Sequence, residues 1–218
     1  LAKSKIDPSL IAGIGVDAVG WTLVPVDGDG NPLHPAMLWL DRRAEEETAW
    51  LKSLPEADDL VKLNANPLDA AYITPKLVWL RKNHPDIFNS THKFLEATGF
   101  IICRFTGEFV CDYTQAYGYH FFDIRNEEWD SHAAQVIGIP IEKMPQLHGT
   151  TEIVGTVTEK AAQQTGLRPG ISVIAGCLDA AVGALGSGVV KPGQTNEQGG
   201  QAGGVGISLD HVVVEPRL

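Results

Sequence analysis

Cysteine is scarce in this sequence, and its few copies lie far apart. The 218 residues contain three, Cys103, Cys111 and Cys177, and none forms a CxxC pair. This pattern predicts neither a disulfide framework nor a zinc site. Because no signal peptide is found either, we expect three buried thiols in a reducing, cytoplasmic compartment.

Long apolar runs and clusters of basic residues are also missing. The longest apolar runs, such as 171–175 and 212–214, are far shorter than the roughly 20 residues that a membrane helix needs. The formal net charge is -10, and no cluster of Lys and Arg offers a face for a phosphodiester backbone. We therefore expect a soluble protein that binds neither membranes nor nucleic acid, and we expect no metal held by protein ligands.

The chain does contain an alternation of strand and helix patterns, and 44% of its residues are hydrophobic, enough for a core. Strands are predicted at 10–17 and 21–27, with a hairpin turn at 28–31. Helices are predicted at 42–54, 57–63 and 97–105. A further helix is predicted to begin at Pro75, with Thr74 as its cap, and to end at His84. Phe121, Phe122, Ile124 and Trp129 are candidate core residues. From Gly155 a strand, a helix (159–165), a strand (171–175), a helix and a strand follow, which indicates the α/β class.

The two ends of the sequence suggest a piece of a longer protein. Leu1 replaces an initiator methionine, and Leu218 comes just after an extended run. We expect elements to be missing at both ends.

A short glycine motif near the start does not indicate dinucleotide binding. Residues 13–18 fit the GxGxxA pattern, which must follow a strand and open a helix. Here the glycines lie inside a strand pattern and a second strand follows, so the motif is disfavoured.

Asp179 is the first candidate for chemistry. A buried strand at 171–175 ends in Gly176 and delivers this carboxylate to the start of a helix rich in small residues. One interpretation is structural, because an acidic group there gains from the helix dipole. The other is a general base at the carboxyl end of a strand, where α/β sheets place their ligands. Periodicity leaves both open.

The second candidate is a glycine-rich turn between two extended runs, at 198–204. Successive backbone N–H groups of such a turn can hold phosphate oxygens. A bulged β-turn would have the same composition. Together with Asp179, the turn suggests a carboxylate that faces a phosphate-binding loop.

Several motifs, in the same order, resemble those of the FGGY carbohydrate kinases, most closely the xylulokinase-like branch. The resemblance covers nearly the whole chain and is carried by four stretches: Pro35 to Arg43, Thr106 to Tyr113, Gly155 to Thr158, and Gly176 to Gln194. The family's catalytic base corresponds to Asp179. Its sugar-contacting positions fall on Val19, Gly20 and Trp21 and near Trp39, and its phosphate turn falls on Gly200, Gln201, Ala202 and Gly203.

The resemblance implies an actin-like, ribonuclease-H-type α/β domain with a mixed sheet flanked by helices. Residues 1–210 would form most of the N-terminal, sugar-binding domain, and 211–218 would begin the connection to a C-terminal domain that this chain lacks. The implied cofactors are ATP and Mg, and the implied partners are a small sugar or polyol, ATP, the missing domain and a second copy in a homodimer.

The chain also departs from the family's pattern. Val19, Gly20 and Trp21 replace a usual Gln-Met-His, and Ala180 replaces an Asn. In the phosphate turn, Gln201 and Ala202 stand where the family commonly has Thr and Ser, so one amide replaces two hydroxyls. These changes leave the identity of the sugar open and suggest altered nucleotide handling.

We therefore expect the parent protein to be a transferase, an ATP-dependent kinase of a ketose or related polyol, with Asp179 as general base. Trp21 and Trp39 either offer apolar faces to sugar C–H groups or simply pack in the core. Arg42 and Arg43 either reach the sugar or pair with the acidic run from Glu45 to Glu47 on a solvated helix face, and the solvated face is favoured for at least one of them. The isolated chain is expected to be inactive. The alternative is a non-catalytic sugar-binding or regulatory protein on the same fold.

Overall fold

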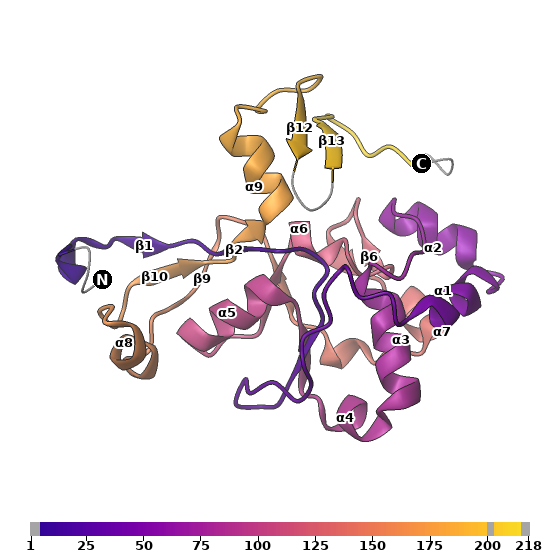
Figure 1. The fold of residues 1–218 in the computed structure, drawn as a ribbon, viewed down its shortest axis with the longest axis horizontal. Helices are drawn as coiled ribbons and strands as arrows, with labels where there is room; N and C mark the ends of the chain where they lie inside the picture. Colours follow the sequence, from indigo (N-terminus) through magenta and orange to yellow (C-terminus); the bar gives the residue numbers. More distant parts are fainter. Residues whose placement is uncertain (1–4, 200–202, 215–218) are drawn as a thin grey trace.

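The computed structural model describes residues 5–199 and 203–214 and has three parts (Figure 1). A small sheet with helix α8 (Glu159–Thr165) lies at one end. A helical lobe lies at the other end, and α9 (Asp179–Gly186) projects from the middle beside the hairpin β12 (Thr195–Gly199) and β13 (Gly203–Ile207). A 3₁₀ turn, η1 (Pro8–Leu10), precedes the first strand.

The small sheet is mixed, as the sequence predicts. Its order is β1 (Gly13–Ile14), β10 (Ser172–Ile174) and β9 (Ile153–Thr156). Strand β10 runs parallel to β1 and antiparallel to β9. Of the glycines in the 13–18 motif, Gly13 lies in β1 and Gly15 lies between β1 and β2, and neither opens a helix, which excludes the dinucleotide motif.

A second parallel pair continues this arrangement toward the middle of the molecule. Strand β2 (Asp17–Ala18) pairs with β11 (Cys177–Leu178), with Asp17 opposite Cys177 and Ala18 opposite Leu178. Because β2 follows β1 and β11 follows β10, two segments far apart in the sequence run side by side. Both strands end at the same edge.

The helices that flank these strands have local signals at their ends. In α8, Thr158 accepts the Ala161 N–H at 3.2 Å, and Gly166 ends the helix at φ 76°. In α5 (Ala97–Thr106), Glu96 accepts the Gly99 N–H at 2.8 Å, and Gly107 takes φ 85°. These two helices confirm the predicted ranges to within one residue.

The helical lobe is built from short helices joined to short strands. The helices are α1 (Glu45–Lys52), α2 (Ala57–Asn64), α3 (Ile73–Asn83), α4 (Pro85–Ser90), α6 (Tyr113–Ala116), α7 (Ser131–Ile137) and the 3₁₀ turn η2 (Ile141–Lys143). The strand pairs are β3 (Val24–Val26) with β4 (Lys93–Leu95), β5 (Val110–Asp112) with β8 (Gln146–His148), and β6 (Phe122–Asp123) with β7 (Glu128–Trp129).

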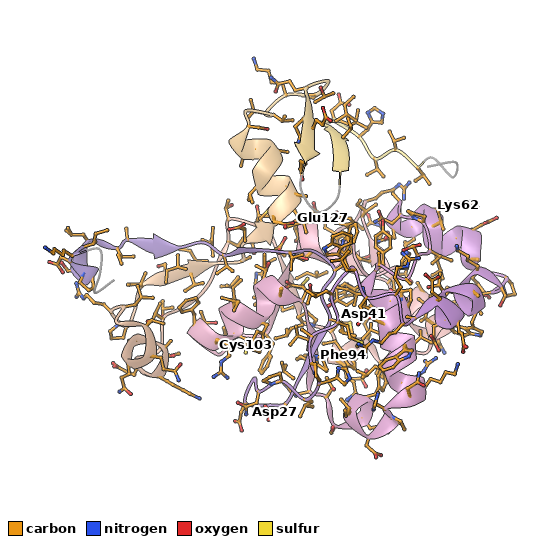
Figure 2. All side chains as sticks on the ribbon, in the orientation of Figure 1. Asp27, Asp41, Lys62, Phe94, Cys103 and Glu127 are labelled. Carbon is orange, nitrogen blue, oxygen red and sulfur yellow. The ribbon has the colours of Figure 1, made fainter. Side chains whose placement is uncertain are left out.

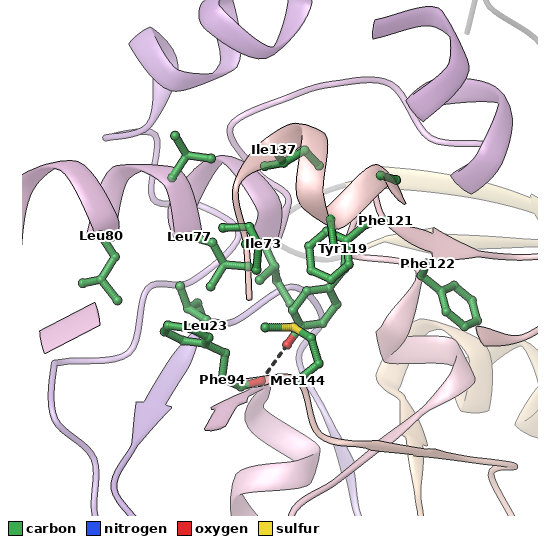
Figure 3. Close-up of a cluster of buried hydrophobic side chains, with 14 of the residues drawn as sticks. Leu23, Ile73, Leu77, Leu80, Phe94, Tyr119, Phe121, Phe122, Ile137 and Met144 are labelled. Carbon is green, nitrogen blue, oxygen red and sulfur yellow. Dashed lines mark hydrogen bonds between the residues drawn. The ribbon is translucent and has the colours of Figure 1, made fainter. Parts of the chain in front are cut away.

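The main hydrophobic core lies inside this lobe (Figure 3). Leu77 and Leu80 of α3 contribute to it together with Phe94 of β4. Phe121 and Phe122 belong to it as predicted, and Ile124 and Trp129 pack against it. The Tyr119 hydroxyl donates to the Phe94 carbonyl at 3.2 Å, so even the polar end of this buried ring is satisfied.

Some sequence predictions are wrong in detail. Thr74 does not cap α3: the helix begins at Ile73, and the Thr74 hydroxyl instead accepts the His120 N–H at 2.7 Å. The strand expected at 21–27 is confined to Val24–Val26, because Trp21 takes a left-handed φ of 55°. The predicted turn at 28–31 is confirmed: the Asp27 N–H donates to the Asn31 carbonyl, and Gly30 takes φ 73°.

The three cysteines are free, and the prediction of buried thiols is right for two of them and wrong for Cys177. Cys103 and Cys111 are buried, whereas Cys177 is only half-buried. Burial raises the pKa of the Cys111 thiol well above its ordinary value. Cys111 therefore behaves as a small hydrophobic side chain.

Two buried carboxyl groups lie at the starts of α5 and α6. Glu96 and Asp112 are both fully buried, and each caps its helix through one oxygen while its second oxygen has no partner among the described residues. Burial raises the pKa of Glu96 to about 8, with the nearby Asp112 charge adding to the shift. Burial also raises the pKa of Asp112 to about 6. At neutral pH, Glu96 is therefore mainly protonated and Asp112 mainly ionised.

These values predict that the protein loses stability as the pH rises. The folded-state pKa of Glu96, about 8, lies above its ordinary value of 4.5, so the folded protein binds the extra proton between these pH values. The free energy of unfolding should fall through this window by roughly 3–5 kcal/mol. Glu96→Gln keeps an acceptor for the Gly99 N–H and should remove most of this fall. Urea unfolding at pH 5, 7 and 9 measures it, with the exposed Glu108→Gln as control. An equally steep fall in Glu96→Gln would contradict the assignment.

Candidate active site

Asp179 lies where β11 ends and α9 begins. Leu178 is the N-cap residue, and Asp179 is the first residue of the eight-residue helix. Its Oδ1 accepts the N–H of its neighbour Ala180 at 2.7 Å, and the side chain is exposed. The carboxylate therefore gains from the helix dipole without being the cap itself, and its second oxygen is available to a ligand.

The backbone turn that delivers Asp179 depends on Gly176. This residue takes φ 81°, and a Cβ built on it would lie 2.2 Å from the Val16 carbonyl oxygen. The same carbonyl accepts the Cys177 N–H at 3.0 Å. Only glycine allows this close approach, which explains physically why a glycine stands before Cys177.

A cavity of about 400 Å³ opens beside Asp179 and gathers the predicted sugar-contacting residues. The residues that line it come from the ends of β2 and β11, the start of α9, the hairpin β12–β13, and Trp39. Its lining residues are Val19, Gly20, Trp21, Trp39, Tyr117, Leu178, Asp179, Ala180, Gln198, Gly203 and Gly204. Of the predicted phosphate turn, Gly203 reaches the cavity, whereas Gly200, Gln201 and Ala202 lie outside the described residues.

Trp21 is held in an unusual conformation at the cavity wall. Its ring stacks on Tyr72 with centroids 4.3 Å apart and meets the edge of Tyr117 at 5.6 Å. Its left-handed backbone is held by Lys76, whose Nζ donates to the Trp21 carbonyl at 3.3 Å. Trp21 thus both packs against other rings and lines the cavity, so the two interpretations of this residue are compatible.

Gly20 packs closely against Leu178 at the edge of the cavity. A Cβ at this position would lie 2.4 Å from Cδ1 of Leu178, which is buried. The segment before Trp21 and the residue before Asp179 are therefore in direct contact. This contact fixes the segment that follows β2 and the end of β11 relative to each other.

Lys76 and Tyr117 are the functional-site neighbours that sequence patterns missed. Lys76 is fully buried in α3, and burial lowers its pKa to about 8 despite the opposing charges of Asp41 and Asp69. Burial raises the pKa of Tyr117 strongly, with Tyr72 and the negative charge of Asp179 adding to it. The nearby Trp21 indole lowers the pKa of Tyr117 and so opposes this shift, although the two groups do not reach hydrogen-bond geometry.

Gln198 closes one side of the cavity. Its Nε2 donates to the Ala180 carbonyl at 3.0 Å, which links the hairpin to the first turn of α9. Beyond this bond lies a neighbouring cavity of about 420 Å³, to which Tyr117, Leu178, Ala180 and Gln198 also contribute. Glu127, beside the hairpin in Figure 2, lines that second cavity rather than the one at Asp179.

Arg42 and Arg43 do not line the Asp179 cavity. Arg42 pairs with Glu45 at 2.6 Å and Asp69 at 2.7 Å. Arg43 pairs with Asp41 at 2.7 Å and lies over the Trp79 ring at 4.8 Å. The predicted pairing with Glu45 to Glu47 is therefore confirmed for Arg42 through Glu45, whereas Arg43 pairs with Asp41 instead.

The described part of the chain contains no group of three or more His, Cys, Asp or Glu side chains that could hold a metal ion. Within the same residues, no helix is both long and apolar enough to cross a membrane. The Asp179 cavity thus lies at the carboxyl ends of two parallel strands, beside one carboxylate, which is where α/β proteins commonly place their ligands.

Comparison with known proteins gives the class. Residues 1–186 match the FGGY family of carbohydrate kinases, N-terminal domain. The chain is 29% identical over 179 residues to a xylulose kinase of Staphylococcus xylosus, covering 82% of this chain and 37% of that protein. It is 34% identical over 160 residues to a glycerol kinase of Thermococcus gammatolerans, covering 71% of this chain and 32% of that protein.

The fold agrees with solved kinases as well. The crystal structure of a xylulose kinase from Rhodospirillum rubrum matches with a TM-score of 0.89 at 27% identity, over 94% of this chain and 42% of that one. The chain therefore belongs to the FGGY family of carbohydrate kinases and carries its N-terminal domain, with the actin-like fold expected from the resemblance. It spans between 32% and 42% of the length of these relatives.

The geometry at Gly176 yields a stability prediction with a matched control. Gly176 and Gly170 have nearly equal φ values, 81° and 83°, but a Cβ at Gly170 would meet no atom within 4 Å. Gly170→Ala should therefore cost only the left-handed strain, about 1–2 kcal/mol. Gly176→Ala adds a clash with backbone and should cost roughly 2 kcal/mol more. Urea unfolding measures both, and equal losses would contradict the close approach to Val16.

Proposed function

We propose that this chain forms the sugar-binding part of an ATP-dependent kinase of a ketose or related polyol, with Asp179 as general base. The observation that carries the proposal is the cavity in which Gly20, Trp21 and Trp39 meet Asp179, its one charged group among the described lining residues. A lone carboxylate in an otherwise uncharged cavity suits one task, which is to accept a proton from a bound hydroxyl.

The proposed reaction balances without a covalent enzyme intermediate. Asp179 accepts the proton of the acceptor hydroxyl while the hydroxyl oxygen attacks the γ-phosphorus of ATP in line, and ADP leaves. The sugar phosphate is released with the proton passed to solvent. Asp179 suits this role because its Oδ1 accepts the Ala180 N–H, while no basic side chain among the described residues forms an ion pair with its carboxylate.

The walls of the cavity suit the apolar faces of a sugar. Trp21, Trp39 and Tyr117 line it together with Val19 and Leu178. Aromatic faces stack on C–H groups and exclude water, which strengthens the electrostatic interactions at Asp179. Compared with the Gln-Met-His that xylulokinases usually carry, this wall offers fewer hydrogen-bonding side chains.

Nucleotide is proposed to bind across the hairpin. The phosphoryl donor that the family resemblance implies is ATP. Gly203 and Gly204 lie at the edge of the cavity, where the glycine turn would present backbone N–H groups to the phosphates. Because Asp179, the one carboxylate among the described lining residues, is assigned as the base, Mg²⁺ is proposed to arrive with the nucleotide, held by phosphate oxygens and water. When bound, it would neutralise charge on the phosphates.

We further propose that a second kinase domain packs against α9 and the hairpin. Helix α9 has no buried residue, and Leu185 and Val205 are 60% and 80% exposed. Large apolar side chains that are this exposed are typical of a surface that another domain covers. Since this chain also spans less than half the length of these relatives, the activity is assigned to the full-length protein, and the isolated chain is expected to be inactive.

The test of this function is an acceptor panel. The full-length protein is incubated with ATP, Mg²⁺ and a series of ketoses and polyols, and ADP release is followed. We expect acceptor-dependent release, with D-xylulose not the best acceptor, because Val19, Gly20 and Trp21 cannot supply the side-chain hydrogen bonds of the usual pattern. Release that no acceptor stimulates, together with measurable sugar binding, would favour the non-catalytic alternative. D-xylulose ranking first by a wide margin would contradict the interpretation of the wall.

Asp179→Asn in the full-length protein separates the catalytic from the structural role of this residue. The variant removes the charge but keeps the size, so turnover should fall roughly 10²- to 10⁴-fold. Acceptor binding and the melting temperature should change little, since an exposed charge in the first helical turn contributes only about 0.3–1 kcal/mol through the helix dipole. Turnover, calorimetric binding and thermal unfolding are measured beside the wild type. Near-normal turnover in a folded variant would remove Asp179 from catalysis.

A further inference from the structure

The residue before Asp179 is held by a side chain from a distant element. The backbone N–H of Leu178 donates to the Thr114 hydroxyl oxygen at 2.8 Å. The Thr114 hydroxyl in turn donates to Oδ1 of Asp112, which also accepts the Thr114 N–H at 2.9 Å. The last backbone amide before Asp179 is therefore tied, through one hydroxyl, to a fully buried carboxyl group.

The next residue, Gln115, holds the other strand of the pair. Its Nε2 donates to the Ala18 carbonyl at 3.2 Å and to the Thr98 hydroxyl at 3.1 Å. Ala18 ends β2, directly before the cavity residues Val19 and Gly20. Two consecutive residues of α6 thus hold the ends of β11 and β2, one strand each.

The direction of these bonds is fixed by chemistry. An N–H such as that of Leu178 can only donate, so the Thr114 oxygen must accept from it. Its single proton then goes to the Asp112 carboxyl oxygen rather than to Cys177 Sγ at 3.4 Å, because sulfur is the weaker acceptor. Valine has the shape of threonine but neither donates nor accepts. It would leave the Leu178 N–H and one Asp112 oxygen without these bonds in a poorly hydrated place.

We propose that Thr114 is a positioning residue for Asp179: its hydroxyl fixes the Leu178 amide and thereby sets where the Asp179 carboxylate stands over the cavity. The consequence for turnover rests on the proposed kinase function. The fixed position of the amide does not. Because reacting groups must be held within a fraction of an ångström, loss of this bond should lower kcat more than it changes KM.

The experiment compares three variants of the full-length protein: Thr114→Val, Thr114→Ser, which restores a hydroxyl, and Thr91→Val as control. Thr91 is also buried and donates its hydroxyl to the Ile87 carbonyl at 2.7 Å, but it lies at the end of α4 and does not line the cavity. Hydrogen–deuterium exchange at the Leu178 amide and steady-state kinetics with the best acceptor are measured for each.

We expect Thr114→Val to speed exchange at Leu178 roughly tenfold and to lower kcat about 10- to 100-fold with KM within about threefold. Thr114→Ser should stay near the wild type in both, and Thr91→Val should change neither. Exchange in Thr114→Val no faster than in Thr91→Val, or faster exchange with an unchanged kcat, would overturn the proposal.

Failure of the kinase function itself gives a different result. In that case the wild type releases no ADP with any acceptor, and exchange at Leu178 alone decides whether Thr114 fixes this amide. Fast exchange in Thr114→Val with rescue by Thr114→Ser then supports the positioning of the strand end, and its absence refutes it.

Discussion

The site depends on one short parallel pairing, that of β2 with β11. Ala18 stands opposite Leu178, so the residues that follow each strand, Gly20 and Trp21 on one side and Asp179 on the other, emerge at the same edge. Parallel pairing is what places two carboxyl ends together, because antiparallel strands would send these residues in opposite directions. The cavity, the start of α9 and the contact between Gly20 and Leu178 all follow from this register.

The pairing of β2 with β11 is stabilised by polar groups of α5 and α6 that are costly to bury. Glu96 and Asp112 begin α5 and α6, and the residues that follow Asp112 hold both strand ends through side-chain hydrogen bonds. An aliphatic core could supply similar packing without the cost of burying carboxyl groups, but it could not fix the backbone amides and carbonyls at the strand ends. In this structure, buried polarity lies where the direction of the backbone matters most.

Local signals predicted much of the fold. Helix α8 was predicted at its observed bounds, because the cap at Thr158 and the glycine at 166 both act within a few residues. Thr74 was misassigned as a cap because its hydroxyl is used by the distant His120 N–H, which no local pattern reveals. The left-handed φ of Trp21 likewise depends on packing against Tyr72 and on Lys76, and it shortened a strand that composition favoured.

The candidate site was predicted from the sequence only in part, for the same reason. Asp179, Gly20, Trp21 and Trp39 were identified from family-like motifs, and they do line one cavity. Lys76, Tyr117 and Thr114 carry no motif of their own and reach the site only through contacts between distant segments. Supporting residues of this kind become visible only once the register of β2 and β11 is known.

The central claim is that the cavity beside Asp179 holds the acceptor with a hydroxyl against this carboxylate. A crystal structure of the full-length protein with its best acceptor tests it most directly. The account predicts one acceptor hydroxyl oxygen about 2.6–3.2 Å from an Asp179 oxygen, with the carbon skeleton against Trp21 or Trp39. An acceptor bound in another cavity, or one whose hydroxyl groups all lie beyond hydrogen-bond reach of Asp179, would contradict it.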